Sequence, residues 1–262
     1  MIKQVKSKFI NNVIPLTVGI FCAVSAMSMQ LLKAKQVAHP VMGKDKYIQQ
    51  HKDELLKLSL LEKLPSFGFD NLISDWAILS FLLYFGDSEA RNQTGYSLSA
   101  DYLELIAEND PLFTKAYTII SPASSMFAGT PQRTVEIMNK GLAKMTAGTP
   151  DAYYVWLYKA MDEVLFLGDL KEAKKSYEMS ANWAKKSGNK RIAKSAEDTA
   201  KFLATKPDIR STQVNVWFMV WNNSKDQRIR QIAETKIESI GGELKTYSDG
   251  RVEAIPPQNS KP

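Results

Sequence analysis

This chain of 262 residues has a single cysteine, Cys22, and only two histidines, His39 and His51. One cysteine excludes an intramolecular disulfide and the cysteine-rich zinc sites. The histidines lie twelve positions apart, which is not the spacing of a zinc-binding helix, and a Ser-His-Asp triad would have to recruit one of them. No catalytic residue, metal site or cofactor-binding motif stands out. The composition therefore predicts a protein that is not an enzyme.

A strong excess of charge of one sign is also missing, since the formal net charge is only +6. The basic residues gather in residues 170–206, which carry 10 basic and 4 acidic side chains. The most basic stretch of this segment, KKSGNKRIAK, has no aromatic residue on which a base could stack. We therefore expect solvated helix faces, which at most touch acidic partners or lipid head groups, and no specific binding of nucleic acid.

Long apolar runs are absent except near the N-terminus, where residues 13–32 carry no charge. A helix of this length spans about 30 Å, the thickness of the hydrocarbon core of a bilayer. Residues 1–12 are basic, which favours a cytoplasmic N-terminus and places the bulk of the chain outside the cytoplasm. We predict a transmembrane anchor over 13–32. The alternative is a secretory signal that is cleaved after Ala26.

The rest of the chain is dominated by helical patterns. Leucines recur among charges within 45–64, so we expect an amphipathic linker helix within residues 33–66. Residues 67–206 are expected to form helical repeats. For residues 207–255 we expect a helix pair with an aromatic core, followed by a small hairpin with a two-residue turn at Asp249-Gly250. Residues 256–262 form a tail.

The stretch FGFDNLISDWAILSFLLYFGD, residues 67–87, is apolar but contains two aspartates. Asp70 stands where a helix N-cap is expected, and Gly86 stands where the helix should stop. The helix is too short to cross a bilayer comfortably, so we predict that residues 71–85 form a buried helix of the soluble domain and not a second membrane span. Asp75 would then be a buried or half-buried carboxylate that pairs with Arg91 or a tyrosine hydroxyl, or alternatively a catalytic or ligand-binding carboxylate.

A turn signature recurs along the chain. The segments LLYFGD, SMFAGT and VLFLGD each end an apolar helical pattern, and their glycines, Gly86, Gly129 and Gly168, are 43 and 39 residues apart. A period of this length with a turn in its middle indicates stacked pairs of helices.

Residues 157–181, LYKAMDEVLFLGDLKEAKKSYEMSA, resemble a tetratricopeptide repeat. Leu157, Ala160 and Met161 match the packing positions of its first helix. Gly168-Asp169 matches the turn, and the small, aromatic and small positions of the second helix are matched by Ala173, Tyr177 and Ser180. Residues 116–142 match less completely, because Pro122 interrupts the first helix. The resemblance implies an all-α fold, an α-solenoid of antiparallel helix pairs.

The N-terminal segment together with FGFDNLISDW also resembles uncharacterised membrane-anchored helical-repeat proteins of cyanobacteria. That resemblance implies no residue roles. It does imply that the soluble domain of a single-pass membrane protein would lie in the periplasm or the thylakoid lumen.

A stack of helix pairs provides a groove for a peptide or a helix. We therefore predict a membrane-tethered scaffold that binds a protein partner, such as an assembly factor of a membrane complex, with no small-molecule substrate evident. The candidate partner-binding residues are Asp75, Tyr84, Tyr117, Tyr154 and Lys159. One alternative is a permanent structural subunit of a membrane complex. Another is a glycan-cleaving enzyme, for which Asp162 and Glu163 are adjacent and should point in different directions.

Overall fold

The computed structural model describes residues 27–28, 43–63 and 65–258. The chain divides into two compact units, Met1–Lys46 and Tyr47–Pro262, and apart from the first three residues of α2 the helices and strands described below belong to the second unit. The predicted anchor over residues 13–32 lies outside the described residues, apart from Met27 and Ser28. Within the described ranges, no helix is both long enough and apolar enough to cross a membrane.

The described part of the chain is mostly helical, with eleven α-helices and one two-stranded antiparallel sheet. The α-helices are α2 (Lys44–Lys63), α3 (Asp70–Gly86), α4 (Ser88–Thr94), α5 (Ser99–Asn109), α6 (Thr114–Pro122), α7 (Pro131–Leu142), α8 (Ala152–Asp162), α9 (Leu170–Lys186), α10 (Lys190–Ala204), α11 (Arg210–Asn223) and α12 (Gln227–Ser239). Two π-helices, η1 (Ala123–Phe127) and η2 (Glu163–Leu167), follow α6 and α8 directly. An all-α fold with a C-terminal hairpin is thus confirmed.

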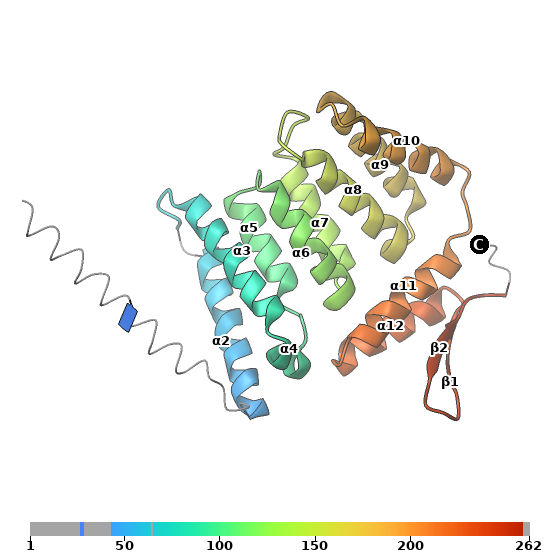
Figure 1. Ribbon diagram of the computed structural model, residues 1–262, viewed down its shortest axis with the longest axis horizontal. Helices are drawn as coiled ribbons and strands as arrows, with labels where there is room; N and C mark the ends of the chain where they lie inside the picture. The colour runs from blue at the N-terminus through green and yellow to red at the C-terminus, as the bar shows by residue number, and fades with distance from the viewer. Residues whose placement is uncertain (1–26, 29–42, 64, 259–262) are drawn as a thin grey trace, which may run out of the picture. The chain divides into compact units, whose positions relative to one another are not determined.

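Helices that are close in sequence pack on one another in succession. Helix α3 packs on α5, α5 on α6 and α7, α8 on α9, α9 on α10, and α11 on α12 (Figure 1). Helix α2 lies beside α3, where the Lys57 ammonium sits 4.0 Å from the centre of the Trp76 ring. This succession of neighbouring helices is compatible with a helical repeat.

Two apolar cores hold these helices together. The larger one contains Phe81, Tyr102 and Tyr117 and draws its buried residues from the helices between α2 and α8. The smaller one contains Trp217 and joins η2, α11 and α12. The sequence predicts that the aromatic residues of α11 lie in a core. The structure agrees, since Val214 and Trp217 are buried and the neighbouring aromatic side chains are partly buried.

Helix α6 continues past the proline that was expected to interrupt it. Pro122 is the last residue of α6, and η1 carries the helix on to Phe127. The Ala128 N–H donates to the Ala123 carbonyl at 3.0 Å, which is the wider spacing of a π-helix. The expected break is therefore replaced by a widened turn that ends at Gly129.

The C-terminal hairpin pairs β1 (Glu243–Thr246) with β2 (Val252–Ile255). Thr246 lies opposite Val252, so five residues, 247–251, form the loop instead of the two that were predicted. The Tyr247 N–H donates to the Arg251 carbonyl at 2.8 Å, and Gly250 takes a φ of 83°. Asp249-Gly250 does lie in the turn. The loop is longer than predicted because the strand pairing ends at Thr246 and Val252.

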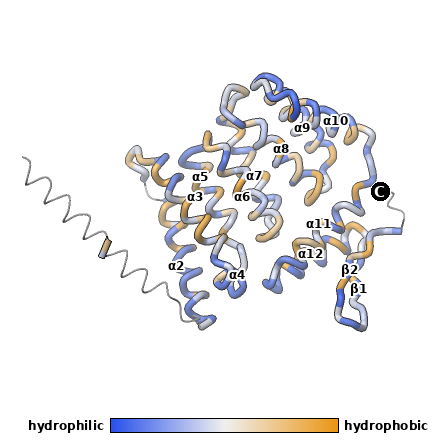
Figure 2. The backbone as a smooth tube through the Cα atoms, in the orientation of Figure 1, coloured by the Kyte–Doolittle hydropathy of each residue, from blue (hydrophilic) through white to orange (hydrophobic). Residues whose placement is uncertain are grey.

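The basic segment lies mainly on α9 and α10, along which hydrophilic residues predominate (Figure 2). Its lysines pair with acids one helical turn away, as in Lys174–Glu178 and Lys194–Asp198, each at 2.7 Å. Such exposed pairs contribute little stability. These helices present solvated faces, as the sequence predicted.

Candidate functional site

Helix α3 is apolar on two opposite faces, of which only one is covered. One face packs into the larger core through Ser74, Ala77, Ile78, Phe81 and Tyr84. On the other face Leu72, Leu79 and Leu83 are 64, 63 and 78% exposed. These leucines, together with the exposed Leu82, form what we call the α3 stripe. The prediction of a buried helix is therefore confirmed for one face of α3 and wrong for the other.

The turn before α3 extends this apolar surface. Phe67 and Phe69 are 84% and 63% exposed. Phe67 and Gly68 both adopt positive φ angles, 52° and 86°, which turn the chain sharply into the helix. A bulky residue rarely takes such an angle, because its Cβ crowds the backbone. Contiguous exposed apolar residues of this kind mark a surface that binds another molecule.

Asp75 lies on the exposed face of α3, among the leucines of the stripe. The expectation that it is buried and paired with Arg91 or a tyrosine is therefore wrong. Among the described residues, its carboxylate has no hydrogen-bond or ion-pair partner. Asp70 likewise is not the N-cap, since α3 begins at Asp70 itself and Phe69 occupies the cap position. The stripe thus carries one unpaired negative charge between its leucines.

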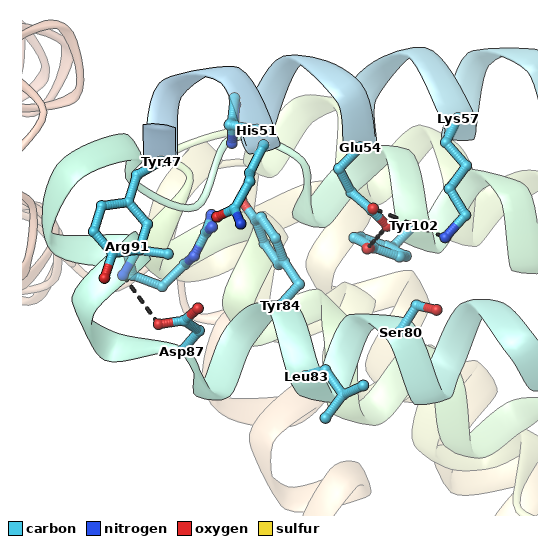
Figure 3. Close-up of a pocket in the computed structure, with 12 residues that line it drawn as sticks. Tyr47, His51, Glu54, Lys57, Ser80, Leu83, Tyr84, Asp87, Arg91 and Tyr102 are labelled. Carbon is cyan, nitrogen blue, oxygen red and sulfur yellow. Dashed lines mark hydrogen bonds and ion pairs between the residues drawn. The ribbon is translucent and has the colours of Figure 1, made fainter. Parts of the chain in front are cut away.

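A pocket of about 310 Å³ opens beside the α3 stripe, and Leu83 belongs to both surfaces. It is lined by side chains from α2, α3, α4 and α5. Figure 3 shows Arg91, Tyr84 and His51 close together between α2 and α3. Glu54, farther along α2, lies beside Tyr102 of α5. We call this the Arg91 pocket.

Arg91 is the most unusual side chain of this pocket, because it is only 7% exposed and has no carboxylate within 4.0 Å in the described part of the chain. Its Nη1 donates to the Gly95 carbonyl at 2.6 Å, and its guanidinium lies 3.7 Å from the centre of the Tyr84 ring. Its Nε is buried and has no partner. Asp87 lines the same pocket, but its Oδ1 accepts the Ala90 N–H at 3.0 Å and so caps α4.

His51 lies next to Arg91 and Tyr84 in the pocket. Its Nε2 is 3.1 Å from the Ser97 hydroxyl, whereas its Nδ1 is buried without a partner. Burial, and then the nearby Arg91 charge, lower the pKa of His51, so the imidazole is neutral at pH 7. Burial also raises the pKa of Tyr84 to about 12, which keeps that hydroxyl protonated.

The far end of the pocket is internally satisfied. The Tyr102 hydroxyl donates to Glu54 at 2.5 Å, and Lys57 lies 3.9 Å from the same carboxylate. Burial, followed by this hydrogen bond, raises the pKa of the Tyr102 hydroxyl. The unsatisfied polar atoms of the pocket are therefore those at its Arg91 end.

The five predicted partner-binding residues do not form one surface. Asp75 lies on the α3 stripe, and Tyr84 lines the Arg91 pocket. Tyr154 is half-buried, with its ring 4.5 Å from that of Tyr153. Tyr117 is fully buried and Lys159 is 5% exposed, so neither side chain is accessible to a partner in this structure.

Lys159 belongs to a buried polar cluster where α8 passes into η2. Its ammonium pairs with Glu163 and donates to the Ser176 hydroxyl at 2.8 Å. Asp162 accepts a hydrogen bond from Ser125 on η1 at 2.6 Å. The two adjacent carboxylates therefore point to different internal partners, as the sequence indicated. Neither is presented as one of the pair that a glycan-cleaving enzyme needs.

Sequence reasoning missed the Arg91 pocket. It treated His51 as isolated and considered Arg91 only as a partner for Asp75. The pocket joins His51 to Arg91 and Tyr102, which lie 40 and 51 positions farther along the chain, and no local pattern brings them together. The one available signal was the shortage of histidine, which makes each histidine worth locating.

Within the described ranges, no group of three or more histidine, cysteine, aspartate or glutamate side chains is placed to hold a metal ion. No family model, no curated protein and no solved structure matches this chain. Function is therefore inferred from the geometry alone.

Proposed function

We propose that this protein is a membrane-tethered helical scaffold of tetratricopeptide type, which docks a protein partner on the α3 stripe. The observation that supports this most directly is the exposed row Leu72, Leu79 and Leu83 on a helix whose opposite face is core. Leaving such side chains in water forgoes about 1.5–3 kcal/mol each, which a partner can recover by burying them.

The stripe suits an amphipathic helix with a basic residue among its apolar anchors. Apolar residues at helical spacing match a helix that lays its own apolar face along them. Asp75, exposed and without a partner among the described residues, supplies a negative charge in the middle of the contact. A lysine or arginine on the partner would pair with it. A bilayer would instead have to accommodate that charge among its lipids, which is unfavourable.

The exposed stripe also favours the second candidate function, that of a permanent subunit of a membrane complex. A surface that is apolar over several helical turns is more typical of a lasting interface than of a transient one. The two functions share the docking surface and differ in whether the partner ever leaves.

The test is site-specific photocrosslinking of the full-length protein in its native membranes. A benzoylphenylalanine at position 79 should give a discrete protein adduct, whereas one at the control position 112, where Leu112 is also exposed, should give none. Asp75→Lys should reduce the adduct by roughly tenfold, since it replaces an attractive charge pair by a repulsive one.

A lipid adduct at position 79, or an adduct of twice the protein's own mass, would overturn the proposal in favour of a membrane surface or a homodimer. Equal crosslinking at 79 and 112 would do the same in favour of non-specific contact. Where a discrete partner is found, its recovery in stoichiometric amount after gentle solubilisation identifies a permanent subunit, and substoichiometric recovery identifies an assembly factor.

A further inference from the structure

The geometry points to a second function of the same domain: the Arg91 pocket binds an organic carboxylate group, which the Arg91 guanidinium holds through its Nε edge. This site does not depend on the α3 stripe having a protein partner. The site is formed by side chains of α2, α3, α4 and α5, which no local sequence pattern brings together.

Two residues that line this pocket, Arg91 and His51, each have a buried polar atom without a partner, Nε and Nδ1 respectively. An unpaired buried polar group is costly, so native structures rarely keep one unless water or a ligand satisfies it. Here both atoms belong to residues that line a cavity of about 310 Å³. That volume is in the range of small-molecule sites, roughly 300–1,000 Å³.

The charge of the Arg91 guanidinium calls for an anion. Arg91 is buried and always protonated, and no acid lies within ion-pair distance of it in the described part of the chain. Its Nη1 is used by the Gly95 carbonyl, which leaves the Nε side of the guanidinium for a ligand. On that side Nε–H and one Nη2–H point in parallel, which matches the two oxygens of a carboxylate.

His51 adds a second contact. It is neutral at pH 7, and its Nε2 faces the Ser97 hydroxyl. When that hydroxyl donates to Nε2, the proton of the imidazole sits on Nδ1, which then donates to the same anion. A carboxylate bound in this cavity would then have a second donor on the lining besides Arg91.

The other residues of the pocket favour a single negative charge and an apolar body. Glu54 and Asp87 line the same cavity, so a doubly charged phosphate would be repelled more strongly than a carboxylate. Tyr47, Tyr84 and Leu83 supply aromatic and apolar surface for the rest of the ligand. The carboxylate can belong to a free organic acid or to an acidic side chain of another protein.

The experiment is a saturation-transfer NMR titration of the full-length protein in a mild non-ionic detergent. Benzoate represents a free acid, and N-acetylglutamic acid N-methylamide represents a protein side chain. Benzamide is the neutral control of the same shape, and inorganic phosphate is the dianionic control. We expect saturable binding of one or both carboxylates, with the tighter one identifying the source, and weaker binding of benzamide and phosphate.

Arg91→Gln should raise the Kd of the carboxylate at least about tenfold, as expected for loss of a charge-assisted pair. The matched control Arg251→Gln, at an exposed arginine on the hairpin, should leave the Kd unchanged. If Arg91→Gln does not fold, as judged by near-UV circular dichroism, His51→Ala takes its place and should also raise the Kd. Benzamide or phosphate binding as tightly as benzoate, absence of saturable carboxylate binding, or an unchanged Kd in the folded variant would overturn the proposal.

Discussion

The two π-helices, η1 and η2, have similar backbone conformations but different buried polar side chains around them. Each extends a helix by five residues and is followed by a glycine in the left-handed region, Gly129 with φ 65° and Gly168 with φ 70°. Both also pack against α11. Around η1 the buried polar groups are hydroxyls, with Thr134 donating to Ser124 at 2.7 Å. Around η2 they are ionisable groups, the Lys159–Glu163 ion pair and the Asp162 carboxyl group.

The comparison shows that the backbone conformation of the two turns does not depend on the polarity of the side chains buried around them. Both segments have the same backbone course because each combines a π-helical turn with a glycine at positive φ. A hydroxyl network is uncharged, so its contribution to stability does not change with pH. A charged network gains more when it is complete and loses more when one member is removed. The turn at η2 should therefore be the more sensitive of the two.

The largest expected effect is the loss of the buried cation. Lys159→Met would leave the Glu163 carboxylate buried without its charge partner and Ser176 without its donor. We expect a loss of about 3–5 kcal/mol in the free energy of unfolding, measured by chemical denaturation. The double variant Lys159→Met/Glu163→Leu, which removes the charge pair altogether, should recover most of it. A double variant as unstable as the single one would contradict this, because the loss of stability would then not come from the unpaired Glu163 charge.

The sequence predicted the helices well, because leucine periodicity and glycines are local signals. It anticipated α2, the turn at Gly168-Asp169 and the helix pair α11 and α12 closely. Asp169 does cap its helix, accepting the Glu172 N–H at 3.0 Å. The helix cap at Asp70 failed because the chain reaches α3 through a tight Phe67-Gly68 turn, which shifts the start by one residue.

Burial could not be predicted in the same way. The apolar composition of α3 allows every face of this helix to be buried. It does not show how many other helices pack against it. Asp75 was misplaced for that reason, since the structure covers only the face that holds Phe81 and Tyr84. The Arg91 pocket and the η1–η2 contact through Ser125 and Asp162 are products of long-range packing, which local spacing does not record.

The next effect in size depends on pH and distinguishes the two turns directly. Burial, with a smaller contribution from Glu163, raises the pKa of Asp162 from 3.8 to about 8, although the Ser125 hydrogen bond acts in the opposite direction. Between these values the folded protein holds a proton that the unfolded chain has released. Stability must therefore fall as the pH rises through this window, by on the order of 1 kcal/mol per pH unit, and level off above it.

Asp162→Asn should remove this slope, because an amide can accept from Ser125 without ionising. We expect the variant to be more stable than the wild type at pH 8 and to approach it near pH 4, in denaturation curves taken across that range. Asp198→Asn, at an exposed acid on α10, is the control and should leave the slope as it is. A wild-type protein whose stability is flat from pH 4 to pH 8 would contradict a buried, protonated Asp162.

The smallest expected effect compares the two glycines. Both adopt left-handed angles, so an alanine at either position should cost roughly 1 kcal/mol in backbone strain. They differ in space: a Cβ at Gly168 would lie 2.8 Å from Gln213 Nε2, whereas at Gly129 the nearest atom is Ile229 Cγ2 at 3.4 Å. Gly168→Ala should therefore be the more destabilising by roughly 0.5–1 kcal/mol, since the buried Gln213 must move. In the Gln213→Ala background that difference should disappear; if the two alanine variants are equally stable with Gln213 in place, the close contact is not a constraint on the η2 turn.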